Sequence, residues 1–277
     1  MADPDDDDEE DDLPGEPLVE DTALASNDAA DPQAVVDRMV PADIRARYDV
    51  VSYRNAAVIL AETRQQEFSE ILNTLRSFSI TTKMIRMAGG NKSEIPKLFS
   101  KRLHPLGWYE TVISADLDIK LSWREEVRKT KSGKAIFGPK ERLIKRKKYL
   151  DGHKIDFVKE KVAFDLEWNS KDQTFDRDLY AMNAFFLAGA IDVGILITRS
   201  KSMDDVFRTV GPALTKAGTV ETDRDGNERP TIVKYGASTT WMGKLVYRLN
   251  AGRNGGCPIL AIGITPACVS DWKRPKK

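Results

Sequence analysis

The sequence has little cysteine and no long apolar run. Two cysteines, Cys257 and Cys268, are too few among 277 residues for a disulfide framework, and neither stands at a metal-ligand spacing. No stretch of about 18 or more apolar residues occurs, which argues against a transmembrane helix. The N-terminus is acidic rather than basic and then apolar, which argues against a secretory signal. These absences predict a soluble, cytoplasmic protein with no membrane partner.

Lysine and arginine are missing from residues 1–31, which carry 14 Asp or Glu. The formal net charge of zero therefore hides a segregation, because residues 32–277 keep all 43 basic residues against 29 acidic ones. We expect residues 1–40 to form a disordered acidic tail and residues 41–277 to form a single domain. A basic body favours a polyanion as partner, and the tail would compete for the same surface. A solvated tail that only aids solubility fits the same composition.

Apolar periodicity predicts alternating helices and strands in the body of the chain. Helices are expected at 54–78, 93–103, 175–189 and 239–250, and strands at 109–123 and 161–168. The runs "IDVGILITR" and "CPILAIGIT" suit central strands that are buried on both faces. A Lys- and Arg-rich insertion at about 123–150 is expected to be partly mobile, and 201–238 to be a loop. The predicted fold class is α/β (α+β), with a central mixed β-sheet flanked by helices.

The segment "IDFVKEKVAFDLEWNSK" places Asp156 before an apolar strand that carries Asp165 and Glu167. Side chains two apart on a strand share a face, so these two carboxylates would lie opposite Leu166 and Trp168. Converging carboxylates raise one another's pKa, and a divalent cation removes the conflict. Oxygen ligands suit Mg²⁺, which also binds substrate phosphates, and the basic body favours nucleic acid as the phosphate source.

Two other interpretations of the acidic strand stay open at this point. The carboxylates could face solvent on an edge strand, paired with some of the many lysines. They could also be the two acids of a glycosidase, although few aromatic residues accompany them.

Four stretches together resemble a known family. "DFVKEKVAFDLEW", the Phe-rich helix that follows it, "IDVGILI" and "PILAIGITP" are similar to the BglII/BstYI-type restriction endonucleases of the PD-(D/E)xK nuclease superfamily. The resemblance is good over 154–198 and 252–266 and weaker over 54–111, whereas the acidic tail and the basic insertion have no counterpart. It implies a restriction-endonuclease-like core.

The resemblance also implies an activity. We expect a type II restriction endonuclease that cuts double-stranded DNA at a short palindromic site, with a GATC core as one expectation, and leaves 5′-phosphate ends. It would act as a homodimer with Mg²⁺, for which Mn²⁺ would substitute. A cognate DNA methyltransferase would protect host DNA without having to bind the chain. The alternatives are a structure-selective repair nuclease of the same fold and a non-catalytic DNA-binding protein.

The resemblance assigns catalytic roles to individual residues. Asp156 matches the first metal-binding Asp, and Asp165 matches the acidic residue of the (D/E)xK strand. Glu167 stands in place of the Lys, as in the BamHI-type variant, which leaves open the group that activates the water. An acidic residue of the early helix often joins such a site, so Glu70 or Glu67 is expected to complete it, although either residue also suits a solvated helix face.

The resemblance further implies two base-reading segments and a phosphate contact. The candidate DNA-binding residues are Asn169, Ser170, Lys171, Ser238, Thr239, Thr240 and Arg253. The first three also suit a polar turn, and the hydroxyl residues of the second segment also suit a helix N-cap. His104 and His153 have no paired ligand nearby in sequence, so both are interpreted as structural.

Overall fold

A computed structural model describes residues 29–87 and 94–275. Residues 1–28 of the predicted tail lie outside the described part. The predicted tail boundary at residue 40 is too late, because helix α1 (Gln33–Met39) already packs on the body. Val36 and Val40 lie one helical turn apart and are both buried in the core.

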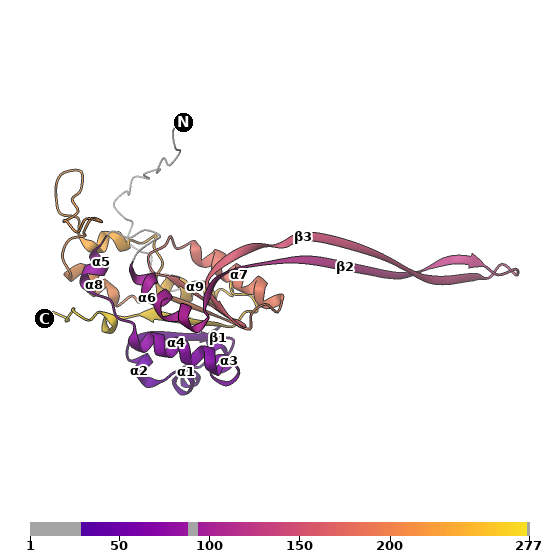
Figure 1. The fold of residues 1–277 in the computed structure, drawn as a ribbon, viewed down its shortest axis with the longest axis horizontal. Helices are drawn as coiled ribbons and strands as arrows, with labels where there is room; N and C mark the ends of the chain where they lie inside the picture. The colour runs from indigo at the N-terminus through magenta and orange to yellow at the C-terminus, as the bar shows by residue number, and fades with distance from the viewer. Residues whose placement is uncertain (1–28, 88–93, 276–277) are drawn as a thin grey trace.

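One mixed sheet organises the described residues (Figure 1), as the sequence predicts. Its strand order is β1-β6-β5-β4-β3-β2, with β4, β5 and β6 parallel and the other neighbours antiparallel. The strands are β1 (Tyr48–Tyr53), β2 (Tyr109–Lys129), β3 (Ala135–Lys159), β4 (Val162–Glu167), β5 (Val193–Arg199) and β6 (Ile259–Ile264). Strands β1 and β3 are the elements of this sheet that the sequence analysis did not identify.

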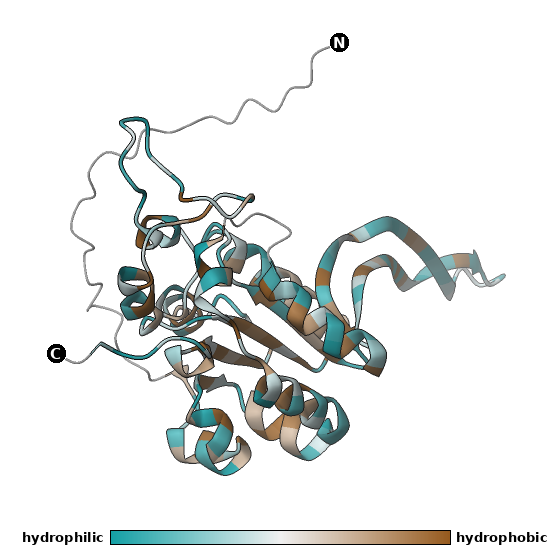
Figure 2. Ribbon diagram, turned by 60° about the vertical axis from the view of Figure 1, so that its left-hand side comes forward, coloured by the Kyte–Doolittle hydropathy of each residue, from teal (hydrophilic) through white to brown (hydrophobic). Residues whose placement is uncertain are grey.

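The two continuous apolar runs form the centre of the sheet, where β5 and β6 are buried along their whole length. Hydropathy colouring shows these strands as the apolar middle of the molecule (Figure 2). Gly194 in β5 allows close packing, because a Cβ there would lie 2.5 Å from Met182 Sδ and 2.7 Å from Ile259 Cδ1. The apolar run that forms β5 can therefore be packed closely where Gly194 stands, as a strand buried on both faces requires.

Helices cover both faces of the sheet and form two apolar cores with it. One core includes side chains of α1, α2 (Ala42–Arg45), α3 (Ala56–Thr63), α4 (Gln65–Ser77), α5 (Thr82–Arg86), α6 (Glu94–Leu103) and α8 (Met203–Thr209). The other core lies against α7 (Thr174–Leu187) and α9 (Met242–Asn250). No helix in 29–87 or 94–275 has both the length and the apolar character to cross a membrane.

Three helix predictions need correction. The helix expected at 54–78 is two helices, α3 and α4, because Arg64 leaves helical geometry at φ −127° and pairs with Asp192. The loop expected at 201–238 contains α8, whose Val206 and Phe207 are buried. Helix α9 begins at Met242 rather than 239, and its N-cap residue makes no side-chain capping bond.

The basic insertion expected to be partly mobile is a long antiparallel ribbon of β2 and β3, which projects from the body (Figure 1). The sequence analysis expected no strand at 135–159 because lysine and arginine interrupt the apolar alternation that identifies strands, whereas cross-strand pairing holds these residues extended. Register shifts occur between Ile113 and Leu117 and again between Glu126 and Arg128, which bend such a ribbon. The ribbon is accordingly curved (Figure 2).

Candidate active site

Strands β3 and β4 diverge where their carboxylates begin. Backbone pairing joins Phe157–Lys159 to Val162–Phe164 and then stops. The Asp156 N–H donates instead to Asp165 Oδ1 at 2.7 Å, and the Leu166 N–H donates to Asp156 Oδ2 at 3.2 Å. Each carboxylate therefore takes the place of a backbone acceptor, which fixes both side chains in the opening between the strands.

Strand β4 separates its carboxylates from its apolar side chains. Leu166 and Trp168 belong to the core under α4 and α6, whereas Asp165 turns toward α7. Asp165 is 4% exposed and Glu167 is 8% exposed, and β4 lies between β3 and β5. The interpretation as a solvated edge strand is therefore wrong.

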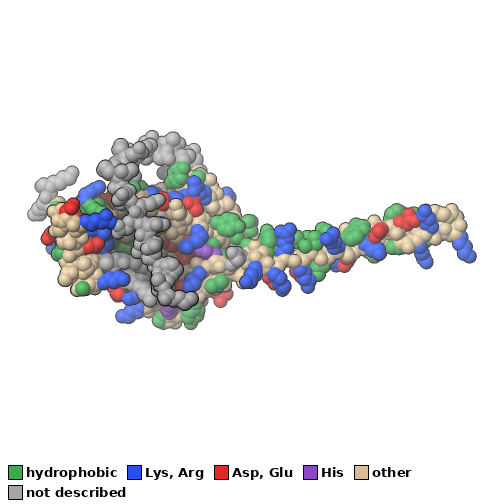
Figure 3. All heavy atoms as spheres, turned by 90° about the horizontal axis from the view of Figure 1, so that it is seen from above, with side chains coloured by type: hydrophobic (Ala, Val, Ile, Leu, Met, Phe, Trp, Pro, Cys, Tyr) green, Lys and Arg blue, Asp and Glu red, His purple; other side chains and the backbone are tan. Residues whose placement is uncertain are grey.

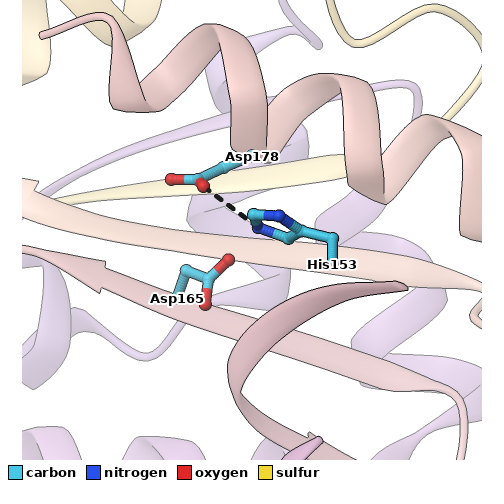
Figure 4. A group of neighbouring side chains, drawn as sticks. All are labelled: His153, Asp165 and Asp178. Atoms are coloured by element: carbon cyan, nitrogen blue, oxygen red, sulfur yellow. Dashed lines mark ion pairs between the residues drawn. The ribbon is translucent and has the colours of Figure 1, made fainter. Parts of the chain in front are cut away.

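Helix α7 adds a carboxylate that the sequence analysis missed. Asp178 is 1% exposed, and its Oδ1 lies 3.4 Å from His153 Nε2 (Figure 4). Potential ligand atoms of His153, Asp165 and Asp178 all lie within 4.8 Å of one another. The purely structural interpretation of His153 thus overlooked its place beside two buried carboxylates.

A signal for Asp178 was present in the sequence. It stands on the same helical stripe as Phe175, Leu179 and Met182, all of which are buried. A carboxylate on an apolar helix stripe is unusual, because burial of an unpaired charge is unfavourable. His153 carries no comparable signal, since its place depends on how the ribbon enters the sheet.

The acidic groups oppose one another's ionisation. Burial, followed by the charges of Asp178 and Asp156, raises the pKa of Asp165 well above its ordinary value. Burial and Asp178 raise the pKa of Glu167 to about 8, against a hydrogen bond with Ser170. Burial also raises the pKa of Asp156, although the Leu166 N–H opposes that rise. The cluster is therefore unfavourable as a set of bare anions.

The site suits a divalent cation. Asp165 Oδ2, Asp178 Oδ2 and His153 Nε2 are buried and have no hydrogen-bond partner among the described residues. Buried polar atoms without a partner carry a desolvation cost, which coordination of a metal ion removes. Carboxylate oxygens suit Mg²⁺ and Mn²⁺, and an imidazole nitrogen is better suited to Mn²⁺ or another transition metal.

Glu70 does not join this cluster, contrary to the prediction. Helix α4 packs on the core that contains Phe157 and Phe164, which is across the sheet from Asp178. Glu70 accepts hydrogen bonds from Trp108 Nε1 at 2.7 Å and from Lys159 Nζ at 2.7 Å. Although burial opposes the change, these bonds lower its pKa. Glu70 is therefore a structural partner of β3.

Glu67, the other candidate of that helix, is buried on α4 as well. It lies one turn before Glu70, on the element that covers the opposite face of the sheet from α7. The carboxylate that a helix contributes to the cluster comes from α7 instead.

The two predicted base-reading segments lie side by side after the carboxyl end of β4. The Thr240 N–H donates to the Ser170 carbonyl at 2.9 Å, and the Asp172 N–H donates to the Ser238 carbonyl at 2.9 Å. Lys171 and Thr239 form an isolated bridge between them. Two loops about 70 residues apart in sequence therefore form one surface next to Glu167.

Only some of these side chains are available to a ligand. Lys171 and Ser238 are exposed, and Asn169 is half-buried with Nδ2 donating to the Lys234 carbonyl at 3.1 Å. Thr240 is fully buried and donates to the Glu167 carbonyl at 3.1 Å, so its predicted DNA contact is wrong. Because the Thr240 hydroxyl makes this bond, it does not cap the N-terminus of α9 as the sequence analysis expected.

One buried arginine supports this surface, and another predicted contact residue is engaged elsewhere. Arg199, which the sequence analysis did not identify, is buried at the end of β5 and donates to Thr239 Oγ1 at 2.8 Å. Burial lowers its pKa to about 10, against its pairing with Asp204. Arg253, the predicted phosphate contact, pairs with Asp176 and stacks over Tyr247 at 5.8 Å. Its guanidinium is thus already engaged.

Comparison with known proteins agrees with this geometry. The family model described as restriction endonuclease BglII/BglIII matches residues 48–264, which include all six strands of the sheet. A search of curated proteins finds no match. Restriction endonucleases cut double-stranded DNA and generally use divalent metals, in agreement with the His153, Asp165 and Asp178 group. The chain belongs to the BglII family of restriction endonucleases.

Proposed function

We propose that the protein is a Mg²⁺-dependent type II enzyme that hydrolyses double-stranded DNA at a short palindromic site and leaves 5′-phosphate ends. The observation that carries this proposal is the convergence of Asp156, Asp165 and Glu167, where β3 and β4 separate, with Asp178 of α7. A Mg²⁺ ion that binds both carboxylates and substrate phosphates explains why a basic protein keeps four acidic groups together.

Within the site, Asp156 and Asp165 hold the metal, for which Mn²⁺ substitutes, and Asp178 is an additional ligand. When bound, the cation supplies the charge that polarises the scissile phosphate. Glu167 accepts the proton of the attacking water at its carboxylate, because the other three carboxylates of the cluster are engaged with the metal. His153, whose Nε2 lies 3.4 Å from Asp178 Oδ1, is a further ligand for the metal.

Base reading falls to the joined surface of the two loops. Lys171 and Ser238 are exposed, so Lys171 can donate to guanine and the Ser238 hydroxyl can contact either base. Asn169 and Ser170 are half-buried, and Asn169 can pair with adenine once its Nδ2 leaves the Lys234 carbonyl. A homodimer with two-fold symmetry matches a palindromic site, so each subunit cuts one strand. A cognate methyltransferase that modifies the same site would protect host DNA.

Digestion of phage DNA of known sequence tests the proposal. The purified protein is incubated with that DNA in Mg²⁺, in Mn²⁺ and in EDTA, and the fragments are sequenced at their ends. We expect discrete fragments with 5′-phosphates in both metals and intact DNA in EDTA. The fragment ends give the recognition site, including whether it has a GATC core.

Two other outcomes would select the alternatives. Cleavage limited to branched or damaged DNA would indicate a structure-selective repair nuclease of the same fold. Intact DNA that nevertheless binds on a native gel would indicate a non-catalytic DNA-binding protein. The buried carboxylates favour a nuclease over the binding protein, because binding alone does not require them.

A further inference from the structure

The outer part of the β2–β3 ribbon has no third layer within the described residues. Strand β4 pairs with β3 only at Phe157–Lys159, so residues 117–149 pair with one another alone. An isolated two-stranded ribbon is at best marginally stable in water. Its apolar side chains remain accessible, with Trp123 45% exposed and Leu121 43% exposed. The ribbon therefore has the character of a surface that becomes buried against a partner.

Cross-strand pairing gives the ribbon two different faces. On one face, apolar residues of β2 lie opposite cations of β3, in the pairs Leu117–Arg146, Leu121–Arg142 and Trp123–Lys140, with Ile119–Ile144 between them. We call these eight residues the cation-rich face. It contains no acidic residue, and its three cations form no ion pair or hydrogen bond within the described chain.

The opposite face carries acids that compensate its cations. Lys145 stands opposite Asp118 in the strand register, and Lys120 Nζ lies 2.8 Å from Glu141 Oε1. Arg124 donates to the Phe137 carbonyl at 3.1 Å. Uncompensated positive charge therefore concentrates on the cation-rich face.

The charge of the whole ribbon selects the kind of partner. Residues 117–149 contain 12 Lys or Arg and four Asp or Glu, and the basic side chains are visible along its length (Figure 3). Two such ribbons would repel each other, which disfavours pairing with a second copy. A polyanion neutralises the charge and releases its own counterions.

We propose that the cation-rich face is a second docking surface for duplex DNA, which holds DNA beyond the cleavage site. This inference rests on the proposed DNA substrate. A two-stranded β-ribbon fits the major groove, and strands at about 3.4 Å per residue from Leu117 to Lys129 reach about 40 Å. That reach spans about 12 base pairs at 3.4 Å each. Lys140, Arg142 and Arg146 contact phosphates, while Leu121 and Trp123 cover sugars and thymine methyl groups.

Binding without cleavage tests this surface. Fluorescence anisotropy in EDTA measures the affinity of the full chain for random-sequence duplexes of about 12 and about 40 base pairs over a range of salt concentrations. The triple variant Lys140→Gln, Arg142→Gln, Arg146→Gln should bind the longer duplex at least about tenfold more weakly. Its slope of log K against log salt should fall by about 2.7, which corresponds to three lost phosphate contacts.

The opposite face supplies the matched control. Lys120→Gln, Arg124→Gln, Lys145→Gln removes the same charge from the same ribbon, and we expect less than about a threefold effect. A photo-crosslinking residue at Leu121 should attach to the DNA, whereas one at Leu143, on the opposite face, should not. Circular dichroism confirms that both triple variants remain folded.

Three results would overturn the inference. Equal losses in both triple variants would mean that the face does not matter, and unchanged binding in both would remove the ribbon from the DNA interface. Sedimentation could instead show that only the first variant loses dimers while its DNA affinity stays the same, which would make the ribbon an interface between copies. Because EDTA prevents cleavage, failure of the proposed hydrolysis would leave this measurement intact.

Discussion

The backbone N–H of Asp156 donates to the side chain of Asp165, at 2.7 Å from Oδ1, rather than to a backbone carbonyl of β4. This exchange links the end of strand pairing to the position of two carboxylates. The same contact leaves Asp165 Oδ2 buried without a partner among the described residues. One oxygen thus holds the strand and the other is available to a cation.

Asp165→Asn should separate binding from chemistry. The amide oxygen can keep the bond from the Asp156 N–H, so the fold is retained, but a charged ligand is lost. We expect cleavage to fall by about 10³-fold or more, because a catalytic metal supplies several kcal/mol of charge stabilisation. DNA affinity in EDTA should change by less than about threefold. Gel assays measure the loss of cleavage, and fluorescence anisotropy measures the retained DNA affinity.

The metal-free protein should lose stability as pH rises. The folded-state pKa of Glu167 is about 8 against an ordinary value of 4.5, so the folded protein binds more protons between these values. The free energy of unfolding therefore falls across that window, by up to about 1.4 kcal/mol per pH unit for this group. Urea denaturation in EDTA from about pH 5 to about pH 8 measures the slope.

Glu167→Gln supplies the comparison for that pH series. In the variant, the free energy of unfolding should fall less steeply with pH. The slope that remains comes from Asp165 and Asp156, whose pKa values are also raised. Identical slopes in both proteins would show that Glu167 is ionised in the folded state as it is in the unfolded state.

Asp178→Asn should lower metal affinity, whereas Glu70→Gln should lower stability alone. The first removes a carboxylate beside Asp165, and we expect Mn²⁺ affinity to fall about 10- to 100-fold in a calorimetric titration. The second removes a partner of Lys159 and Trp108 across the sheet. It should lower thermal stability while Mn²⁺ affinity and the cleavage rate stay within about threefold of wild type. A large loss of Mn²⁺ affinity in Glu70→Gln would contradict the assignment.

Removal of residues 1–28 should strengthen DNA binding at low salt. These residues carry 13 Asp or Glu and no Lys or Arg, so we expect them to compete with DNA for the basic surface. We expect a severalfold lower Kd at about 0.05 M salt and little difference at about 0.5 M, where charge is screened. A tail of the same length with neutral polar residues should behave like the deletion. If it behaves like wild type, charge competition is not the cause.

Periodicity predicted the central part of the fold because burial dictated it. The runs that became β5 and β6 are apolar at nearly every position, and Phe175, Leu179 and Met182 mark the buried side of α7. The strand expected at 109–123 is the first part of β2. The rest of the ribbon was missed because its residues are ordered by pairing across strands, which no local pattern in a basic sequence reveals.

The site was predictable where its residues are close in sequence. Asp156, Asp165 and Glu167 lie within 12 positions, so strand geometry and family resemblance located them. Asp178 and Arg199 come from other elements, and their roles depend on packing between α7, β5 and the loop before α9. Glu70 was misplaced because sequence does not show which face of the sheet a helix covers.

The cleavage rate of phage DNA as a function of Mg²⁺ concentration tests the central claim most directly. Wild-type protein and Asp165→Asn are first freed of metal with EDTA and then compared at equal occupancy of DNA. Our account predicts a rate that rises and saturates with Mg²⁺ for wild type and stays at background for the variant. Equal rates for the two proteins, or cleavage by wild type in EDTA, would contradict it.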